Sequence, residues 1–478
     1  MRGLLIGALL TLVAGLGGCT DASVRDADPG ALTPAMGEQL RWTLDVINHR
    51  RPLPDDAELD DHFSTYLLER SPHGATQRLL RGYAKRLAPL TIDRVLGSDG
   101  AKTSFVADSR QGRVRVLLDL DGESGRLRGI FIDPYLDRSI EGLVELVPTL
   151  APRAQLLLAE VVDGRCQPLA GVGGDEPLAI AEASRLYVLH AVADAIVDGD
   201  LRWDTPLTIR DAWKDAASST MADATDGEAL SIRAFAEAMM WRGDTTAADH
   251  LIRALGRERV EAAVRAAGTR EPERDVPYLT SREAHHLQAL DRAEVDRYLA
   301  LEVDARRRYL EALSPEDAGD LDGVAAPVGS TPEGDLDRIG AFASARDVCD
   351  ALGSLQRRAE GHPELAPILE LLGEPGPQYR PFLARRPVWG WIGGTDGATD
   401  DIHSHARLLR REDGRWFAAI LALNGGSFDA DERRLLQAIE ARLVDLLDEA
   451  PDAATATPLG SELKSGILAD AGASRRRR

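Results

Sequence analysis

Glu182 and Arg185 form a pair whose types and spacing could do chemistry. They lie three residues apart at the start of an apolar segment, so on a helix they would share one side, one turn apart. A carboxylate has no hydroxyl with which to attack a carbonyl carbon, and a guanidinium stays protonated near neutral pH, so it cannot serve as a base. The spacing therefore favours an ion pair. Ser184 does carry a hydroxyl, but it lies two residues past Glu182, a rotation of about 200°, and we expect it to face away.

Two histidine pairs raise the question of a metal site: His285-His286, and His403 with His405. Neither pair has the i, i+4 spacing with which two histidines on a helix bind zinc, and no matching set of carboxylates accompanies them. We expect exposed loop or strand histidines, and neither a metal nor another cofactor.

The N-terminus has the layout of an export signal. Arg2 precedes an apolar run from Leu4 to Leu16 that is too short to span a bilayer comfortably. The run ends in Leu16-Gly17-Gly18-Cys19, which resembles a bacterial lipobox, with small residues for a signal peptidase and a thiol to take the lipid. We predict a signal peptide over residues 1–18, a lipidated Cys19 and a polar tether over residues 19–36. The protein would then be lipid-anchored and extracytoplasmic in a bacterial cell envelope; an ordinary signal with a chance cysteine is the alternative.

The composition bounds the rest of the chain. Its 478 residues allow two or three domains, and 44% hydrophobic with 28% charged side chains argue against wholesale disorder. With 57 basic and 78 acidic residues the formal net charge is −21, which argues against nucleic-acid binding. Besides Cys19, only Cys166 and Cys349 remain. In an extracytoplasmic compartment they either form a disulfide or stay as free, buried thiols.

Hydrophobic periodicity predicts a first domain over residues 37–147. Apolar residues at three- and four-residue spacing indicate helices over about 36–50 and 76–87, and alternation from about 90 to 133 indicates an antiparallel meander. This domain is small and α+β. At the other end of the chain, residues 451–478 are rich in Ala, Thr and Pro and end in four arginines. We expect a disordered tail there, solvated or in contact with acidic lipid.

A second domain is predicted over residues 148–450. It begins with two strands around Asp163-Gly164, and a long helix with Leu186 and Leu189 on its apolar stripe follows. Further helices are expected at about 232–241, 247–255, 282–289 and 344–359, then two strands around Asp413-Gly414 and a last helix from Leu435 to Leu447. Strands at both ends of the unit imply one sheet completed by distant segments. The predicted fold class is α+β.

This order of elements resembles that of the penicillin-recognising serine hydrolases, which include the class A β-lactamases. The resemblance covers about residues 37–430. Within this family the chain is similar in particular to the subgroup, known from clavulanic-acid gene clusters, that has a small α+β domain in front. Many weak matches carry it: Leu186 to Leu189 with Ala193 to Ala195, Trp203 to Arg210, Gly243 to Asp249, Leu251-Ile252, Leu255-Gly256, Val276 to Glu283 and Trp391 to Thr395.

The resemblance implies changed chemistry at all three family motifs. It puts Glu182 at the nucleophile position and Arg185 at the position of the lysine that helps to take the proton. Gly243-Asp244-Thr245 stands at the Ser-Asp-Asn motif, and Ile392-Gly393-Gly394 stands at the Lys-Thr/Ser-Gly strand. Asp244 is expected to cap a helix that begins near Thr246.

Three incompatible changes point to a pseudoenzyme. The leading hypothesis is a cell-envelope lipoprotein of this family that has lost acyl-enzyme chemistry and acts in binding or regulation. Its partners would be the membrane, through Cys19, and a peptidoglycan-type or β-lactam-like ligand or an envelope protein. The alternatives are an active serine hydrolase of β-lactamase or esterase type with relocated groups, and a structural interaction lipoprotein with no ligand cleft. The candidate cleft residues are Glu182, Arg185, Asp244, Thr245, Trp391, Thr395 and Asp396, with Trp389 and Trp391 on one face of a strand as cleft lining or core.

Overall fold

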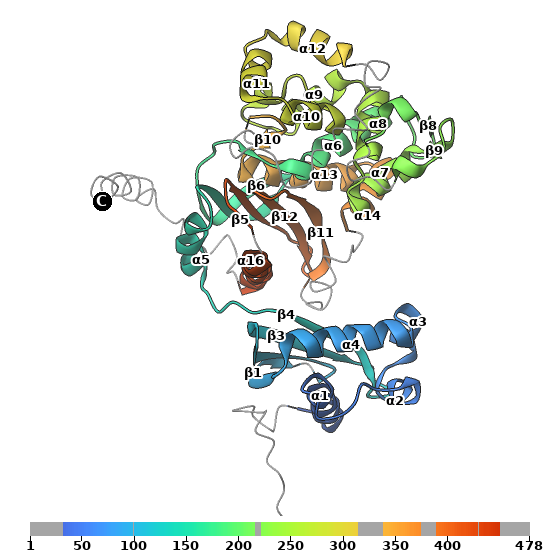
Figure 1. The fold of residues 1–478 in the computed structure, drawn as a ribbon, viewed down its shortest axis with the longest axis vertical. Helices are drawn as coiled ribbons and strands as arrows, with labels where there is room; N and C mark the ends of the chain where they lie inside the picture. The colour runs from blue at the N-terminus through green and yellow to red at the C-terminus, as the bar shows by residue number, and fades with distance from the viewer. Residues whose placement is uncertain are drawn as a thin grey trace, which may run out of the picture. The chain divides into compact units, whose positions relative to one another are not determined.

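The chain divides into two compact units, residues 1–133 and 134–478 (Figure 1). The computed structural model describes residues 32–98, 100–215, 221–313, 338–373, 389–428 and 430–449. The predicted signal peptide, Cys19, most of the tether and the predicted tail lie outside these residues. The first helix, α1 (Pro34–Ile47), already begins inside the range expected for the tether, because Thr33 caps it and Pro34 opens it.

The first unit packs four helices on an antiparallel sheet. After α1 come α2 (Asp56–His62), α3 (Thr65–Arg70) and α4 (His73–Leu87), and then the strands β1 (Thr91–Ser98), β2 (Lys102–Ser109), β3 (Gly112–Leu120) and β4 (Leu127–Pro134) in the order β1-β2-β3-β4. Alternate residues of β3, among them Val114, Val116 and Leu118, are buried against the helices. The alternation in the sequence therefore predicted the meander correctly.

The boundary between the units differs from the expected one at 147/148. The segment after Pro134 forms α5 (Ile140–Leu146), and Leu143 and Val147 are fully buried in a core shared with strands and a helix of the second unit. Since their apolar side chains pack there, this segment belongs to the second unit.

A five-stranded antiparallel sheet forms the centre of the second unit. Its order is β11-β12-β13-β5-β6, from β5 (Arg153–Val162), β6 (Arg165–Val172), β11 (Trp389–Ala398), β12 (Ile402–Arg411) and β13 (Trp416–Asn424). Strand β5 pairs with β13 over its length, so segments far apart in the sequence complete one sheet, as predicted. Leu156 and Leu158 face one core with α16 (Ala430–Glu449), whereas Leu157 and Ala159 face a second core with α6 (Arg185–Val197) and α13 (Ala345–Gly361).

The helical part of this unit lies between β6 and β11 in the chain (Figure 1). It comprises α6, α7 (Ile232–Arg242), α8 (Thr245–Leu255), α9 (Arg257–Ala266), α10 (Ser281–Gln288), α11 (Arg292–Leu299), α12 (Val303–Ala312), α13 and α14 (Pro367–Gly373). Two short ribbons accompany the helices, β7 (Leu178–Ala179) with β10 (Phe342–Ala343) and β8 (Pro206–Thr208) with β9 (Ala229–Ser231). The α+β prediction is confirmed.

The two cysteines whose state the sequence left open form a disulfide. Cys166 on β6 is bonded to Cys349 on α13, with 6.1 Å between their Cα atoms and a sequence separation of 183. The bond ties an edge strand of the sheet to the longest helix of the second core. Among the described helices, none is both long and apolar enough to cross a membrane.

Candidate functional site

Glu182 and Arg185 lie where a short 3₁₀ turn, η2 (Ala181–Ser184), leads into α6. Ala181 has a φ of +46°, a left-handed conformation that a non-glycine residue seldom adopts, and such conformations gather at functional sites. Glu182 follows it and is half-buried. Burial lowers the pKa of Arg185, while the negative charges of Glu182 and Asp244 oppose that shift. The structure thus brings Glu182, Arg185 and Asp244 together, but the expected ion pair between Glu182 and Arg185 does not form. Glu182 accepts from the Ala398 N–H, and Arg185 donates to the Gly243 carbonyl oxygen.

The guanidinium of Arg185 occupies space that Gly243 leaves open. Its Nη2 donates a hydrogen bond to the Gly243 carbonyl oxygen at 3.1 Å. Gly243 ends α7 with a φ of +67°, and a Cβ atom there would lie 3.3 Å from Nη1 of Arg185. A serine at position 243 would therefore both strain the backbone and crowd the arginine.

Asp244 and Thr245 begin α8. Asp244 is fully buried, and its carboxylate accepts hydrogen bonds from the backbone N–H of Ala247 at 2.8 Å and of Met221 at 2.7 Å. The predicted capping role is confirmed, because the first of these bonds is the N-cap of the helix. The hydroxyl of Thr245 is buried and makes no hydrogen bond with the residues that the structure describes.

Strand β11 meets η2 at Gly397 and Ala398. The Ala398 backbone N–H donates to Oε2 of Glu182 at 2.9 Å. A Cβ atom on Gly397 would lie 2.4 Å from the Ile180 carbonyl oxygen and 2.8 Å from the Glu182 nitrogen. Only glycine permits so close an approach of strand to turn. Neither Gly397 nor Ala398 was among the site residues expected from the sequence.

The predicted third motif, Ile392-Gly393-Gly394, does not lie beside Glu182. Ile392 is 3% exposed and faces the core under α16, and a Cβ atom on Gly393 would lie 2.4 Å from the Leu372 carbonyl oxygen of α14. Gly394 lies against the backbone of β12 at Ala406. The error arose because β11 contains four glycines, and the sequence does not show which of them approaches η2.

Trp389 and Trp391 do not share a face, contrary to expectation. The pairing of β11 with β12 shifts between them, so an extra residue, Gly390, reverses the alternation. Trp389 is buried in the core under α16, whereas Trp391 packs against the other core beside Trp416, with ring centroids 5.2 Å apart. Trp391 is therefore a packing residue at a distance along β11 from Ala398.

Thr395 and Asp396 lie next to Gly397 on the same strand. Thr395 is 5% exposed. The Asp396 carboxylate is bound by Arg407 and His405 of β12 rather than by Glu182 or Arg185. Asp396 is thus near η2 along the chain, but its charge is taken up within the sheet.

The histidines differ in part from the expected exposed loop or strand positions. His405 on β12 is 1% exposed, and Nε2 of His403 donates to the carboxylate of Glu440 of α16 at 2.7 Å. His285 is exposed but lies on α10, where its Nδ1 is 3.2 Å from Oδ2 of the buried Asp215. Hydrogen bonding to Asp215 raises the pKa of His285, and Asp249 and Glu182 add to this. Within the described ranges, no three metal-binding side chains gather in one place.

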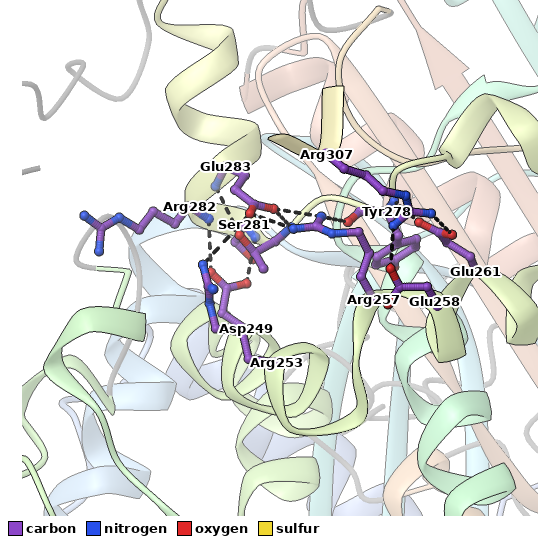
Figure 2. A network of polar contacts seen from close by, with 11 residues as sticks. Asp249, Arg253, Arg257, Glu258, Glu261, Tyr278, Ser281, Arg282, Glu283 and Arg307 are labelled. Atoms are coloured by element: carbon purple, nitrogen blue, oxygen red, sulfur yellow. Dashed lines mark hydrogen bonds and ion pairs between the residues drawn. The ribbon is translucent and has the colours of Figure 1, made fainter. Parts of the chain in front are cut away.

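Tyr278 connects η2 to a network of charged side chains. The Tyr278 hydroxyl donates to the Ser184 carbonyl oxygen at 3.0 Å, and the Tyr278 N–H donates to Glu261 at 3.1 Å. Arg307 binds the same Glu261 at 2.5 Å, so α12 is tied to α9 (Figure 2). Contacts that join residues 94 positions apart leave no signal in a single sequence.

The second half of this network holds α10. Arg257 donates two hydrogen bonds to the buried carboxylate of Glu283, at 2.8 and 3.0 Å, and a third to the Tyr278 carbonyl oxygen (Figure 2). Asp249 of α8 accepts from the N–H groups of Ser281 and Arg282 at the start of α10. Burial raises the pKa of Asp249 to about 7. The network fixes residues 276–283 against α8, α9 and the beginning of α6.

Part of the second unit matches a known protein family. A model of the family described as "Beta-lactamase enzyme family" matches residues 153–322. The chain is similar to the solved structures of a β-lactamase from Sphaerobacter thermophilus DSM 20745 (15% identity, 66% of this chain and 98% of that one, TM-score 0.46) and of a class A β-lactamase from Bacteroides cellulosilyticus DSM 14838 (13%, 66% and 100%, 0.46). It is also similar to the TLA-3 extended-spectrum β-lactamase (12%, 64% and 96%, 0.47). No curated protein matches the chain.

The family match confirms the resemblance at the level of fold. Residues 153–322 run from β5 through the helical part of the second unit, and they include η2, α6 and α8. Residues 153–322 of the second unit therefore carry the sequence pattern of the β-lactamase enzyme family.

Proposed function

We propose that this chain is a lipid-anchored protein of the bacterial cell envelope that uses a β-lactamase-like fold without acyl-enzyme chemistry, in binding or regulation. The observation that carries the proposal is the hydrogen bond from the Ala398 N–H to the Glu182 carboxylate. A carboxylate stands at the nucleophile position, and the neighbouring backbone donor is already satisfied by it.

Acyl transfer by this fold needs a hydroxyl, a base and donors for the developing oxyanion. Glu182 offers no hydroxyl, and Arg185 keeps its proton and spends one donor on the Gly243 carbonyl oxygen. Gly243 offers no side chain to move a proton. The charges at these positions stabilise the native structure instead of a reaction.

The sequence up to Cys19 and the disulfide support export. Disulfides persist in oxidising compartments and are rare in the cytosol. Cys166 and Cys349 are both buried, so the folded second unit shields the bond from solvent. An envelope location places the site within reach of a peptidoglycan-type or β-lactam-like ligand or an envelope protein.

The absence of acyl-enzyme chemistry is tested with a fluorescent penicillin. The pure full chain and an active class A β-lactamase are incubated with the probe and resolved on a denaturing gel. We expect no covalent band from this chain. A band that disappears in Ser184→Ala would overturn both the assignment of Glu182 to the nucleophile position and the proposal.

The lipid anchor is tested by metabolic labelling with an alkyne fatty acid. We expect label on the wild-type chain and none on Cys19→Ala, with Cys19→Ala released from the membrane fraction. Equal label on the two chains would contradict the anchor at Cys19.

One observation favours the alternative of an active hydrolase with relocated groups. Asp215 fixes Nδ1 of the exposed His285, which leaves Nε2 as a base of raised pKa. Such a hydrolase would turn over a chromogenic acyl ester, and His285→Gln would abolish the turnover. A rate equal to the buffer background for both chains supports the non-hydrolytic proposal.

A further inference from the structure

Asp396 is held by three donors that belong to its own sheet. Arg407 donates from Nη1 to Oδ1 at 2.8 Å and from Nη2 to Oδ2 at 2.9 Å, which is the two-pronged geometry of guanidinium with carboxylate. His405 donates from Nδ1 to Oδ1 at 2.8 Å. The three N–H groups define a place shaped for one carboxylate.

The donors keep their positions through contacts other than Asp396. Nη1 of Arg407 also donates to the Thr395 and Ala406 carbonyl oxygens, at 3.2 and 3.0 Å. Nδ1 of His405 lies 3.2 Å from Glu440 of α16, which also pairs with His403. Backbone oxygens and α16 therefore hold the guanidinium and the imidazole in place, and removal of the Asp396 carboxylate leaves these supports intact.

The charges around the Asp396 carboxylate stabilise its ionised form. Burial raises the pKa of Asp396, but the positive charge of Arg407 and the hydrogen bond from His405 outweigh burial and hold the pKa well below its usual range. Burial and the charge of Arg407 lower the pKa of His405, while Glu440 and Asp396 raise it. An imidazole with its proton on Nδ1 donates that proton to Asp396.

Asp396 differs in solvent exposure from the two residues that bind it. The side chains of Arg407 and His405 are each 2% exposed, whereas that of Asp396 is 34% exposed. The donors form a buried floor, and the carboxylate that covers them is the part that solvent reaches.

We propose that Asp396 is an internal ligand, whose carboxylate fills a carboxylate receptor made by Arg407 and His405 and excludes carboxylate-bearing ligands from it. The inference deepens the proposed function, on which its biological meaning rests, because it names a ligand class that the native chain rejects beside η2. Truncation of Asp396 opens the receptor to small carboxylates from solution.

Chemical rescue by formate tests the proposal on the full chain. Asp396→Ala keeps the Cβ atom and removes a carboxyl group of the size of formate. We expect this variant to melt below the wild type in sodium chloride, and 100 mM sodium formate at equal ionic strength to restore half or more of the lost Tm. The wild type should melt at the same temperature in both salts.

Two controls separate a built receptor from a general salt effect. Asp396→Asn fills the place without a charge and should show no gain specific to formate. Asp413→Ala removes a carboxylate that Arg411 binds at 2.6 and 2.9 Å in an exposed turn, and it should show none either. If Asp396→Ala does not fold in chloride, Asp396→Ser takes its place.

Equal Tm in formate and chloride for the truncated variant would overturn the proposal, as would an equal formate gain in Asp396→Asn. Because the readout is thermal stability, failure here leaves the outcome of penicillin labelling unaffected. A penicillin band, conversely, would overturn the non-hydrolytic function and leave the receptor standing.

Discussion

The carboxylate of Glu182 accepts a hydrogen bond from the backbone N–H of Ala398, at 2.9 Å and across 216 residues of chain. The bond joins η2 to the edge strand of the sheet, at the point where Gly397 allows the two backbones to touch. The Glu182 side chain thus links the helical part of the second unit to the sheet.

Removal of this link should lower the thermal stability of the protein. Glu182→Ala loses the acceptor for the Ala398 N–H, and a hydrogen bond of this kind contributes about 1 kcal/mol net. We expect the Tm to fall by about 2–4 °C. Glu182→Gln retains an acceptor oxygen and should melt within about 1 °C of the wild type in the same thermal scan. A Gln variant as unstable as the Ala variant would show that the charge, rather than the bond to Ala398, stabilises η2.

Gly397 should tolerate no side chain. A Cβ atom there meets the Ile180 carbonyl oxygen at 2.4 Å, and overpacking of this type costs about 1–3 kcal/mol. Gly397→Ala should therefore lower the Tm by several degrees. Gly390→Ala is the matched control on the same strand, since its nearest contact would be the Arg410 carbonyl oxygen at 3.9 Å. Equal Tm values for the two variants would contradict the close approach of β11 to η2.

Most helices and strands could be predicted from the sequence because hydrophobic periodicity is a local property of each element. The alternation in β3 and the apolar stripe of α6 are read within one element, and the order of elements led to the β-lactamase-like fold. Around Glu182 and Arg185 the helical spacing also sufficed, since both lie within one turn of each other.

The predicted position of the third motif beside Glu182 was wrong for a physical reason. Which glycine of β11 approaches η2 depends on how far the strand extends along η2, and a single sequence does not show this. One extra residue reverses the faces of every side chain before it relative to those after it. The bulge at Gly390 leaves no mark in the sequence other than one more glycine, so Trp389 and Trp391 were expected on one face.

Reduction of the disulfide should destabilise the second unit. Cys166 and Cys349 close a long loop, and loss of such a bond costs about 2–4 kcal/mol. In a Cys19→Ala background, a reductant should lower the Tm by several degrees. The further replacement of Cys166 and Cys349 by Ala should remove this response to reductant. Two free thiols per chain in the unreduced, denatured Cys19→Ala protein would contradict the bond.

Asp275 should make the stability of the folded protein fall as the pH rises from 3.8 to about 8. Its Oδ1 accepts from the Phe342 N–H at 2.9 Å, its Oδ2 is buried with no hydrogen-bond donor among the described residues, and burial raises its pKa to about 8. The native state thus holds a proton that the unfolded chain, with a pKa near 3.8, releases. This contribution is fully present below pH 3.8 and is lost progressively as the pH rises to about 8.

Asp275→Asn keeps the acceptor for Phe342 and cannot ionise. The difference in Tm between this variant and the wild type should therefore grow from pH 5 to pH 9, in favour of the variant. One pKa unit corresponds to about 1.4 kcal/mol, so a gain of at least about 2–4 °C is expected. The titration of all other groups cancels in this difference. Asp163→Asn, at a side chain 85% exposed, should give a difference that is the same at both pH values. A constant difference for Asp275→Asn as well would show that Asp275 ionises freely in the folded protein.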